Sequence, residues 1–306
     1  GRPERAYPRT GRVDDGDPTD DGRGEAVVVD RRPDLVRRVD GRDDVGVGRH
    51  HLGVVGVDGF RCDMAWAVPD SFWRELRDRV KSIDREFLLM DETIPYIPAF
   101  HEGMFDVHFD ATLYFQLRQI GRGVEPAASL LDAIDQRAAI GFPDHAIFLQ
   151  YIENHDETRY RVECGDSAAA AAGAATFTLP GVPMVYAGQE IGQRGRRDQI
   201  AWEHVREPIR EQYKRLLALH AAHPALGPEG ALQRVEYHVA SGDITTSPVE
   251  AGADDAKRAH YSDVVAFIRS NATEAFLVVL NFSPHAAAVA VSESHGNRNI
   301  VTDSPC

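Results

Sequence analysis

From Val54 onwards, short apolar runs alternate with amphipathic stretches along the chain. This alternation is typical of strand–helix units that build a parallel sheet. The apolar runs predict strands at Val54–Cys62, Phe87–Met90, Phe105–Phe109, Ile147–Tyr151 and Met184–Tyr186. We therefore expect five strand–helix units in the segment 54–227.

The clearest amphipathic stretch follows the first predicted strand. Asp70 or Ser71 can cap a helix there, because a side-chain oxygen accepts a hydrogen bond from the first free backbone N–H groups. The face expected to cover the sheet carries apolar residues at three- and four-residue steps, namely Trp73, Leu76, Val80 and Ile83. Further helices are predicted at Ala127–Ala139, Ser167–Phe177 and Glu207–His223, the last ended by Pro224 and Gly227.

After Pro228 the helical periodicity stops and short alternating runs follow. They predict strands at Leu232–Val239, Val264–Arg269, Ala275–Phe282 and Ala287–Val291. The Asp-, Ala- and Gly-rich stretch Ser241–Arg258 is expected to form a surface loop. We interpret residues 228–306 as a small antiparallel β-sandwich domain that follows an α/β domain at 54–227.

The first 53 residues differ in kind from the rest of the chain. They are rich in Arg, Asp and Gly, hold one aromatic residue, Tyr7, and show no sustained helical or strand period. We expect a non-native or disordered leader. A reading-frame error in GC-rich DNA would produce this composition, and a solvated natural leader is the competing explanation.

The charge balance limits the classes of partner. Among 306 residues, 48 are acidic and 34 are basic, which gives a formal net charge of -14. Coulomb repulsion then disfavours nucleic acids and anionic membranes as partners, and a neutral substrate fits better. The only lysines are Lys81, Lys214 and Lys257. Adaptation to high salt, which screens self-repulsion, and a GC-rich genome explain this composition equally well. The oligomeric state is left open.

Cysteine content and hydropathy narrow the chemistry and the location. Cys62, Cys164 and Cys306 follow no metal-binding or disulfide spacing, so we expect free thiols. No run of eighteen apolar residues occurs, and the first residues lack the apolar core of a signal peptide. The expectation is a cytoplasmic protein that does not span a membrane, unless a preceding segment carries a signal.

Acidic residues follow three of the predicted strands. Asp63 ends the segment Gly59–Asp63, Glu92 ends Leu89–Glu92, and Asp156 ends Tyr151–Asp156. In an α/β barrel, the carboxyl ends of all strands meet at one mouth, so these acids can converge on one substrate. A single acid there is more simply a helix cap or an ion-pair partner. Three together favour a retaining glycosidase, whose nucleophile and proton donor are about 5–5.5 Å apart.

Two neighbours of these acids can assist them. Arg61 precedes Asp63 by two residues, so both side chains face the same side of the strand. The guanidinium would keep Asp63 ionised as a nucleophile, although a structural ion pair would give the same pattern. His155, next to Asp156, can donate a hydrogen bond to a sugar hydroxyl, or it can be a packing residue.

These segments resemble signatures of the α-amylase family, glycoside hydrolase family 13. Gly56–Asp63 is similar to the family's fourth-strand signature, with its Arg and second Asp. Met90–Glu92 resembles the fifth-strand acid segment, and Tyr151–Asp156, with Asn-His-Asp, resembles the seventh-strand segment. Leu179–Glu190 is similar to the eighth-strand segment. The four segments occur in the family's order and spacing.

The resemblance implies a (β/α)8 TIM barrel followed by a β-sandwich, and retaining hydrolysis of α-1,4-glucosidic bonds in starch, glycogen or malto-oligosaccharides. It implies that Asp63 is the nucleophile, Glu92 the general acid/base and Asp156 the carboxylate that binds sugar hydroxyls. Arg61 and His155 assist. The raised pKa of a buried acid and the ionised state of an arginine-paired acid agree with these roles.

The chain departs from the family pattern upstream of Asp63. The family's third-strand segment, an Asp followed by Asn-His, has no counterpart in residues 1–53, so only strands four to eight of the barrel are recognisable. No cofactor is indicated with certainty. Calcium is possible, but its usual ligands are not recognisable. Met64–Ala67 stands where many α-amylases have Lys-His, and Trp66 can stack on a glucose ring or pack in the fold.

We therefore expect an α-amylase-type glycosidase whose activity on starch is impaired in this chain. A transglycosylase or isomerase of the same family, such as a glucanotransferase or a trehalose synthase, shares every residue named above. An inactive sugar-binding or truncated fragment is the third alternative.

Overall fold

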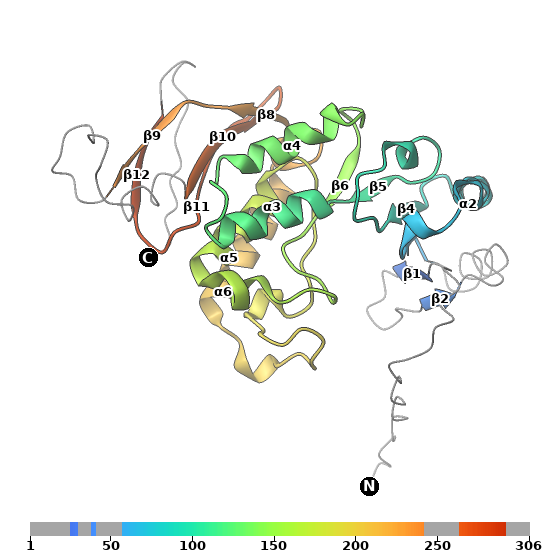
Figure 1. Cartoon of the computed structure of the whole chain (residues 1–306), viewed down its shortest axis with the longest axis horizontal. Helices are drawn as coiled ribbons and strands as arrows, with labels where there is room; N and C mark the ends of the chain where they lie inside the picture. The colour runs from blue at the N-terminus through green and yellow to red at the C-terminus, as the bar shows by residue number, and fades with distance from the viewer. Residues whose placement is uncertain (1–24, 30–37, 41–56, 242–262, 292–306) are drawn as a thin grey trace, which may run out of the picture.

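The computed structural model describes residues 25–29, 38–40, 57–241 and 263–291 (Figure 1). Within these residues, one seven-stranded sheet has the order β2-β1-β3-β4-β5-β6-β7. Its last five strands are parallel and follow the chain order. They are β3 (Gly59–Cys62), β4 (Leu88–Asp91), β5 (Val107–Phe109), β6 (Ile147–Gln150) and β7 (Val182–Pro183). The expected parallel sheet is therefore present.

Two short strands lie in the segment 1–53, where the sequence pattern predicted none. β1 (Glu25–Val29) pairs antiparallel with β2 (Arg38–Asp40) and with β3. The run Val27–Val29 is β-branched and favours a strand, but it is too short to establish a period. The other residues of 1–53 lie outside the described ones, so the non-native or disordered leader stays a prediction.

Five helices are described: α2 (Asp70–Ile83), α3 (Ala111–Gly121), α4 (Ser129–Ala139), α5 (Tyr160–Thr178) and α6 (Glu207–Ala222). The predicted positions of α4 and α6 are confirmed to within two residues. The pattern did not predict α3, which begins after Asp110, whose carboxylate accepts the N–H of Leu113 at 3.2 Å. α5 starts seven residues before the predicted Ser167, with a break at Gly165 (φ 85°).

Two predicted details of α2 are wrong. Trp73, Leu76 and Val80 are buried, but Ile83 is 50% exposed. Ile83 is the last residue of the helix, where the chain turns towards β4. Pro69 precedes the helix and no side chain caps it, so neither Asp70 nor Ser71 has the expected capping role.

The last strand of the parallel sheet lies earlier than predicted. β7 covers Val182–Pro183, and the expected strand residues Met184–Tyr186 follow it. Met184 N–H still donates to the carbonyl of Gln150 at 2.8 Å, but the N–H of Tyr186 donates to the Gln189 side chain at 3.0 Å. The pairing with β6 therefore ends here, because the N–H of Tyr186 is bound within a local turn and not to the sheet.

The described residues of the C-terminal part form two antiparallel sheets, which confirms part of the predicted β-sandwich. β8 (Ala231–Arg234), β10 (Val264–Ser270) and β11 (Ala275–Asn281) form the first, and β9 (Tyr237–Ser241) with β12 (Ala287–Val291) form the second. The predicted strand Leu232–Val239 is thus divided between two sheets. The predicted loop after Ser241 lies outside the described residues.

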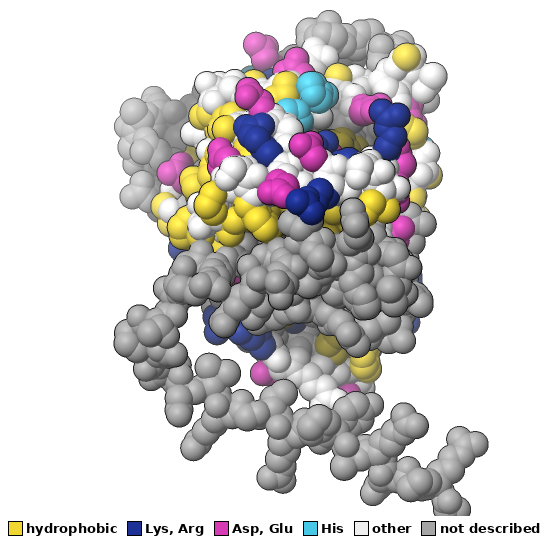
Figure 2. Space-filling model, turned by 90° about the vertical axis from the view of Figure 1, so that its right-hand side faces the viewer, with side chains coloured by type: hydrophobic (Ala, Val, Ile, Leu, Met, Phe, Trp, Pro, Cys, Tyr) yellow, Lys and Arg dark blue, Asp and Glu magenta, His cyan; other side chains and the backbone are white. Residues whose placement is uncertain are grey.

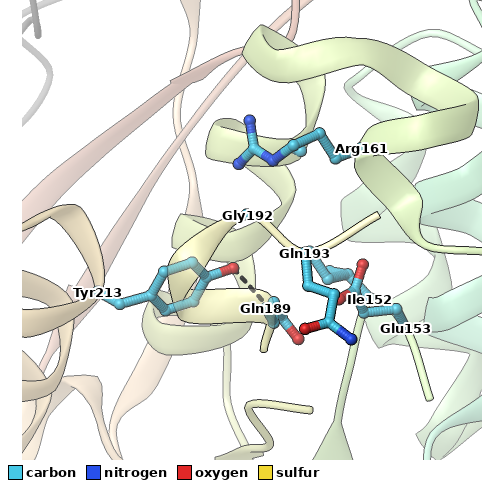
Figure 3. A pocket seen from close by; sticks show the side chains of 8 residues that line it. Ile152, Glu153, Arg161, Gln189, Gly192, Gln193 and Tyr213 are labelled. Atoms are coloured by element: carbon cyan, nitrogen blue, oxygen red, sulfur yellow. Dashed lines mark hydrogen bonds between the residues drawn. The ribbon is translucent and has the colours of Figure 1, made fainter. Parts of the chain in front are cut away.

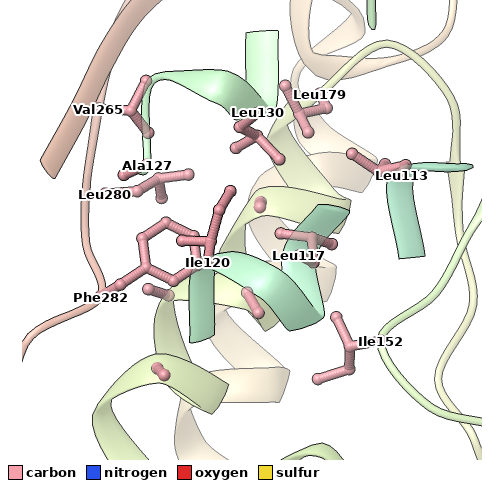
Figure 4. Packing of buried hydrophobic residues seen from close by; sticks show 14 of the residues in the cluster. Leu113, Leu117, Ile120, Ala127, Leu130, Ile152, Leu179, Val265, Leu280 and Phe282 are labelled. Carbon is pink, nitrogen blue, oxygen red and sulfur yellow. The ribbon is translucent and has the colours of Figure 1, made fainter. Parts of the chain in front are cut away.

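One hydrophobic core joins the first C-terminal sheet to the helices. Figure 4 shows Leu117 and Ile120 of α3 and Leu130 of α4 close to Val265 and Leu280 of the sheet. All five are buried. This shared core supports the helices that cover the parallel sheet, while the predicted boundary at 227/228 stays a prediction.

Acidic and basic side chains occur together on the described surface. The face shown in Figure 2 mixes acidic and basic side chains with hydrophobic ones. In the described part of the chain, no helix has the length and apolar character needed to cross a bilayer. Cys62 and Cys164 are free thiols, as expected, and Cys306 lies outside the described residues.

Candidate active site

Arg61 brings two of the three predicted acids together at the carboxyl end of β3. One terminal nitrogen of its guanidinium contacts Asp63, and the other contacts Glu92. The guanidinium also lies 5.8 Å from the centre of the Phe109 ring, on strand β5, which is separated from β3 by β4. One arginine therefore fixes two carboxylates from consecutive strands beside each other, in the place that the sequence predicts.

The structure distinguishes Glu92 from its neighbour Asp91. Asp91, the last residue of β4, is buried and accepts hydrogen bonds from His108 at 2.5 Å and from the N–H of Phe109 at 3.2 Å. Glu92 follows the strand and faces Arg61 instead, and one of its oxygens accepts the N–H of Met64 at 3.1 Å. Only Glu92 of this pair thus lies beside Asp63.

Glu92 has the electrostatic environment of a proton donor. Burial raises the pKa of Glu92 to about 7, and the nearby Asp63 adds to the rise, while Arg61 and the Met64 N–H act against it. A carboxyl group with a pKa near neutral can hold a proton at the pH at which it must donate it. Asp63 binds the same guanidinium. The two carboxyl groups are thus suited to a proton donor, Glu92, and a nucleophile, Asp63.

The raised pKa of Glu92 predicts a stabilising substitution. Because the folded-state pKa lies above the ordinary 4.5, the folded protein loses stability as pH rises from about 4.5 to about 7 and Glu92 ionises. Glu92→Gln removes this cost. We expect its melting temperature to exceed that of the wild type at pH 8 and to match it at pH 4.5, as measured by scanning fluorimetry. A lower melting temperature at pH 8 would contradict the burial argument.

Asp156 lies on the segment that follows β6. Its N–H donates to the side chain of Asn154 at 2.9 Å, and Nε2 of His155 lies 3.1 Å from its carboxylate. Burial lowers the pKa of His155, and the charges of Arg61 and Arg197 lower it further. The segment follows β6, which is parallel to β3 in the same sheet, so it leaves the sheet at the edge where Asp63 and Glu92 lie.

Trp66 lies three residues after Asp63, in the 3-10 helix η2 (Ala65–Ala67), and is 47% exposed. Met64, which precedes η2, has a left-handed backbone (φ 43°), uncommon for a residue other than glycine. The strained turn directs the chain away from β3 directly after Asp63. Trp66 is therefore available at the surface next to the acids, and the packed alternative does not apply to it.

The predictions missed a group of arginines around Asp156. Arg197 contacts the Asp156 carboxylate, and Arg196 donates to its backbone carbonyl at 2.8 Å. Both belong to the run Arg194–Arg197, which follows the segment similar to the eighth strand. That cluster of like charges was the available signal, but no local pattern shows that it folds back onto Asp156.

The described residues do not form a metal centre. In the segments 57–241 and 263–291, no three His, Cys, Asp or Glu side chains are placed to hold one ion. The carboxylates of the site are instead bound by arginines. Carboxylates that are paired with arginines do not fit calcium at this position.

Comparisons with known proteins agree with this geometry. The family model described as the alpha amylase catalytic domain matches residues 42–262. Alpha-amylase MalA of Haloarcula japonica is 47% identical over 265 residues, which cover 85% of this chain and 37% of that protein. Neopullulanase 2 of Thermoactinomyces vulgaris is 30% identical over 183 residues, 54% of this chain and 30% of that protein. The chain thus spans about a third of these relatives.

Solved structures show the same fold. A cyclomaltodextrinase has a TM-score of 0.64 at 22% identity, over 78% of this chain and 39% of that one. The ligand-free cyclic alpha-maltosyl-(1→6)-maltose hydrolase of Arthrobacter globiformis has a TM-score of 0.62 at 23% identity, over 81% and 55%. The five parallel strands of the described chain are consistent with part of the (β/α)8 barrel of these enzymes. The chain belongs to the α-amylase family of glycoside hydrolases.

Proposed function

We propose that this chain carries the catalytic carboxylates of an enzyme that cleaves α-1,4-glucosidic bonds in starch, glycogen or malto-oligosaccharides with retention of configuration. The observation that supports it best is the Arg61 guanidinium shared by Asp63 and Glu92. Retaining glycosidases need two carboxyl groups about 5–5.5 Å apart, one ionised and one protonated. A guanidinium that contacts both carboxyls holds them next to each other, which supports this pairing of roles.

In the first step, Asp63 attacks the anomeric carbon while Glu92 gives its proton to the leaving glycosidic oxygen. The carbon–oxygen bond to the leaving sugar breaks, and an ester between the sugar and Asp63 forms. Arg61 contacts Oδ1 of Asp63, so Oδ2 is the oxygen left for the attack. In the second step, Glu92 takes a proton from water, the water oxygen attacks the same carbon, and the ester breaks. Two inversions give net retention.

The role of Asp156 in this mechanism is to bind hydroxyl groups of the sugar ring. Its side chain is half exposed, is contacted by His155, and lies on the segment that follows β6 at the same edge of the sheet as the two acids. A carboxylate there can accept hydrogen bonds from two ring hydroxyls, and these bonds strengthen as the ring distorts towards the oxocarbenium-like transition state. Trp66 adds an exposed aromatic face on which a second sugar can stack.

The test uses α-maltosyl fluoride, because fluoride leaves without being protonated and the assay then reports on Asp63 and on sugar binding. We expect α-maltose as the first product by proton NMR. β-Maltose as the first product, or no fluoride release, would contradict the proposal. Products longer than maltose would indicate the transglycosylase alternative. Starch is expected to be a poor substrate, because residues 1–53 contain no Asp-x-x-x-Asn-His segment.

A further inference from the structure

Arg197 binds Asp156 in a way that an ordinary surface ion pair does not. Its terminal nitrogen contacts the Asp156 carboxylate, while Nε donates to the carbonyl of His155 at 2.8 Å. The neighbouring Arg196 donates to the carbonyl of Asp156 at 2.8 Å. With the bond from Asp156 N–H to Asn154, every polar group of this residue is held. The side chains of Arg197 and Asp156 are 57% and 49% exposed, so the pair adds little to stability.

A buried arginine, Arg159, holds the loop that carries Arg197. Arg159 is 1% exposed and donates to the carbonyls of Gly195 and Ala187, each at 2.8 Å. A third nitrogen binds Glu153 at 2.7 Å, and the guanidinium lies 4.2 Å from the centre of the Tyr186 ring. Arg159 thus ties the loop after β7 to the segment that holds Asp156.

The same loop packs over a small polar cavity. Figure 3 shows Glu153 and Gln193 on one side of it and the bonded pair Gln189 and Tyr213 on the other. Gln193 also accepts the N–H of Ala201 at 3.1 Å, which closes the loop on itself. The loop is therefore a folded unit, and its position relative to Asp156 is defined.

We propose that Arg197 is a positioning residue, which fixes the orientation of the Asp156 carboxylate for the sugar hydroxyls. This inference rests on the proposed function. An ionised carboxylate has about four acceptor sites. Arg197 occupies one on Oδ1 and His155 one on Oδ2, which leaves one on each oxygen for two neighbouring hydroxyls. Without Arg197, the half-exposed carboxylate can rotate, and both hydroxyl bonds lose their alignment.

The test compares Arg197→Ala, Arg197→Lys and the control Arg210→Ala, on α-maltosyl fluoride. Arg210 is an exposed arginine of α6 that pairs with Glu207. We expect kcat/KM to fall about 10–100-fold in Arg197→Ala, because small misplacement of a binding group costs this much. Arg197→Lys should have a kcat/KM at most about threefold above that of Arg197→Ala. A single ammonium group cannot bind the Asp156 carboxylate and the His155 carbonyl at once, as the planar guanidinium does. Arg210→Ala should match the wild type.

A double-mutant cycle separates positioning from other roles. In an Asp156→Asn background, Arg197→Ala should change kcat/KM less than about threefold, because its effect passes through the carboxylate. The full 10–100-fold loss in that background, or wild-type kcat/KM in Arg197→Ala, would overturn the inference.

Maltotriose binding, measured by calorimetry on the same variants, separates this inference from the proposed function. If the wild type releases no fluoride but binds maltotriose more tightly than Arg197→Ala does, the proposed function is contradicted and the positioning role of Arg197 is supported. A wild type that turns over fluoride equally well without Arg197 would contradict the positioning alone. A wild type that does neither would contradict both.

Discussion

Replacing Asp63 by asparagine is expected to lower kcat for α-maltosyl fluoride by about 10⁴-fold or more. The amide keeps the shape of the side chain and can still accept a hydrogen bond from Arg61. It cannot form the sugar ester, because its oxygen is a weak nucleophile. Fluoride release under saturating substrate measures the loss.

The same substitution at Asp78 is the matched control, since Asp78 lies exposed on α2. Asp78→Asn should keep wild-type activity. If Asp63→Asn retains activity within tenfold of the wild type and still melts at the wild-type temperature, another residue is the nucleophile.

Replacing Arg159 by methionine is expected to destabilise the fold by about 3–5 kcal/mol. The change leaves Glu153 buried without its charged partner, and burial already raises the pKa of Glu153. It also removes the donors to the carbonyls of Gly195 and Ala187. The melting temperature should fall by roughly 10 °C for a domain of this size, and scanning calorimetry measures the fall.

Two variants test the cause of this loss. In Arg159→Met with Glu153→Gln, the neutral side chain can still accept the N–H of Tyr160, so part of the stability should return. Arg210→Met, at an exposed position, should have no measurable effect. If the melting temperature falls equally in Arg159→Met and in Arg210→Met, the loss does not come from the buried ion pair.

The sequence was sufficient for those parts of the site that are local along the chain. Asp63 and Glu92 directly follow strands, and their partner Arg61 lies within the first of them, β3. Parallel strands bring such ends together whatever the rest of the chain does. Trp66 was left open between a surface and a packed position because exposure depends on residues distant in sequence. The helix α3 was missed because its Thr, Tyr and Phe residues favour strands as much as helices.

Contacts between distant segments could not be predicted. Arg197 reaches Asp156 across 41 positions, and Arg159 reaches Gly195 across 36. Neither contact follows from a period or a spacing, since both depend on how one loop folds back. The strands β1 and β2 escaped prediction for a related reason, because strands this short are defined by their pairing partners more than by their own residues.

The most direct test of the central claim is to identify the residue that carries the sugar. An α-glucosyl fluoride with a second fluorine at carbon 5 slows both steps and allows the glycosyl-enzyme to accumulate. Mass spectrometry of the digested protein should then find one fluoroglucosyl group on the peptide that contains Asp63, and none in Asp63→Asn. A label on any other residue, such as Asp91 or Glu92, would contradict the assignment of Asp63 as the nucleophile.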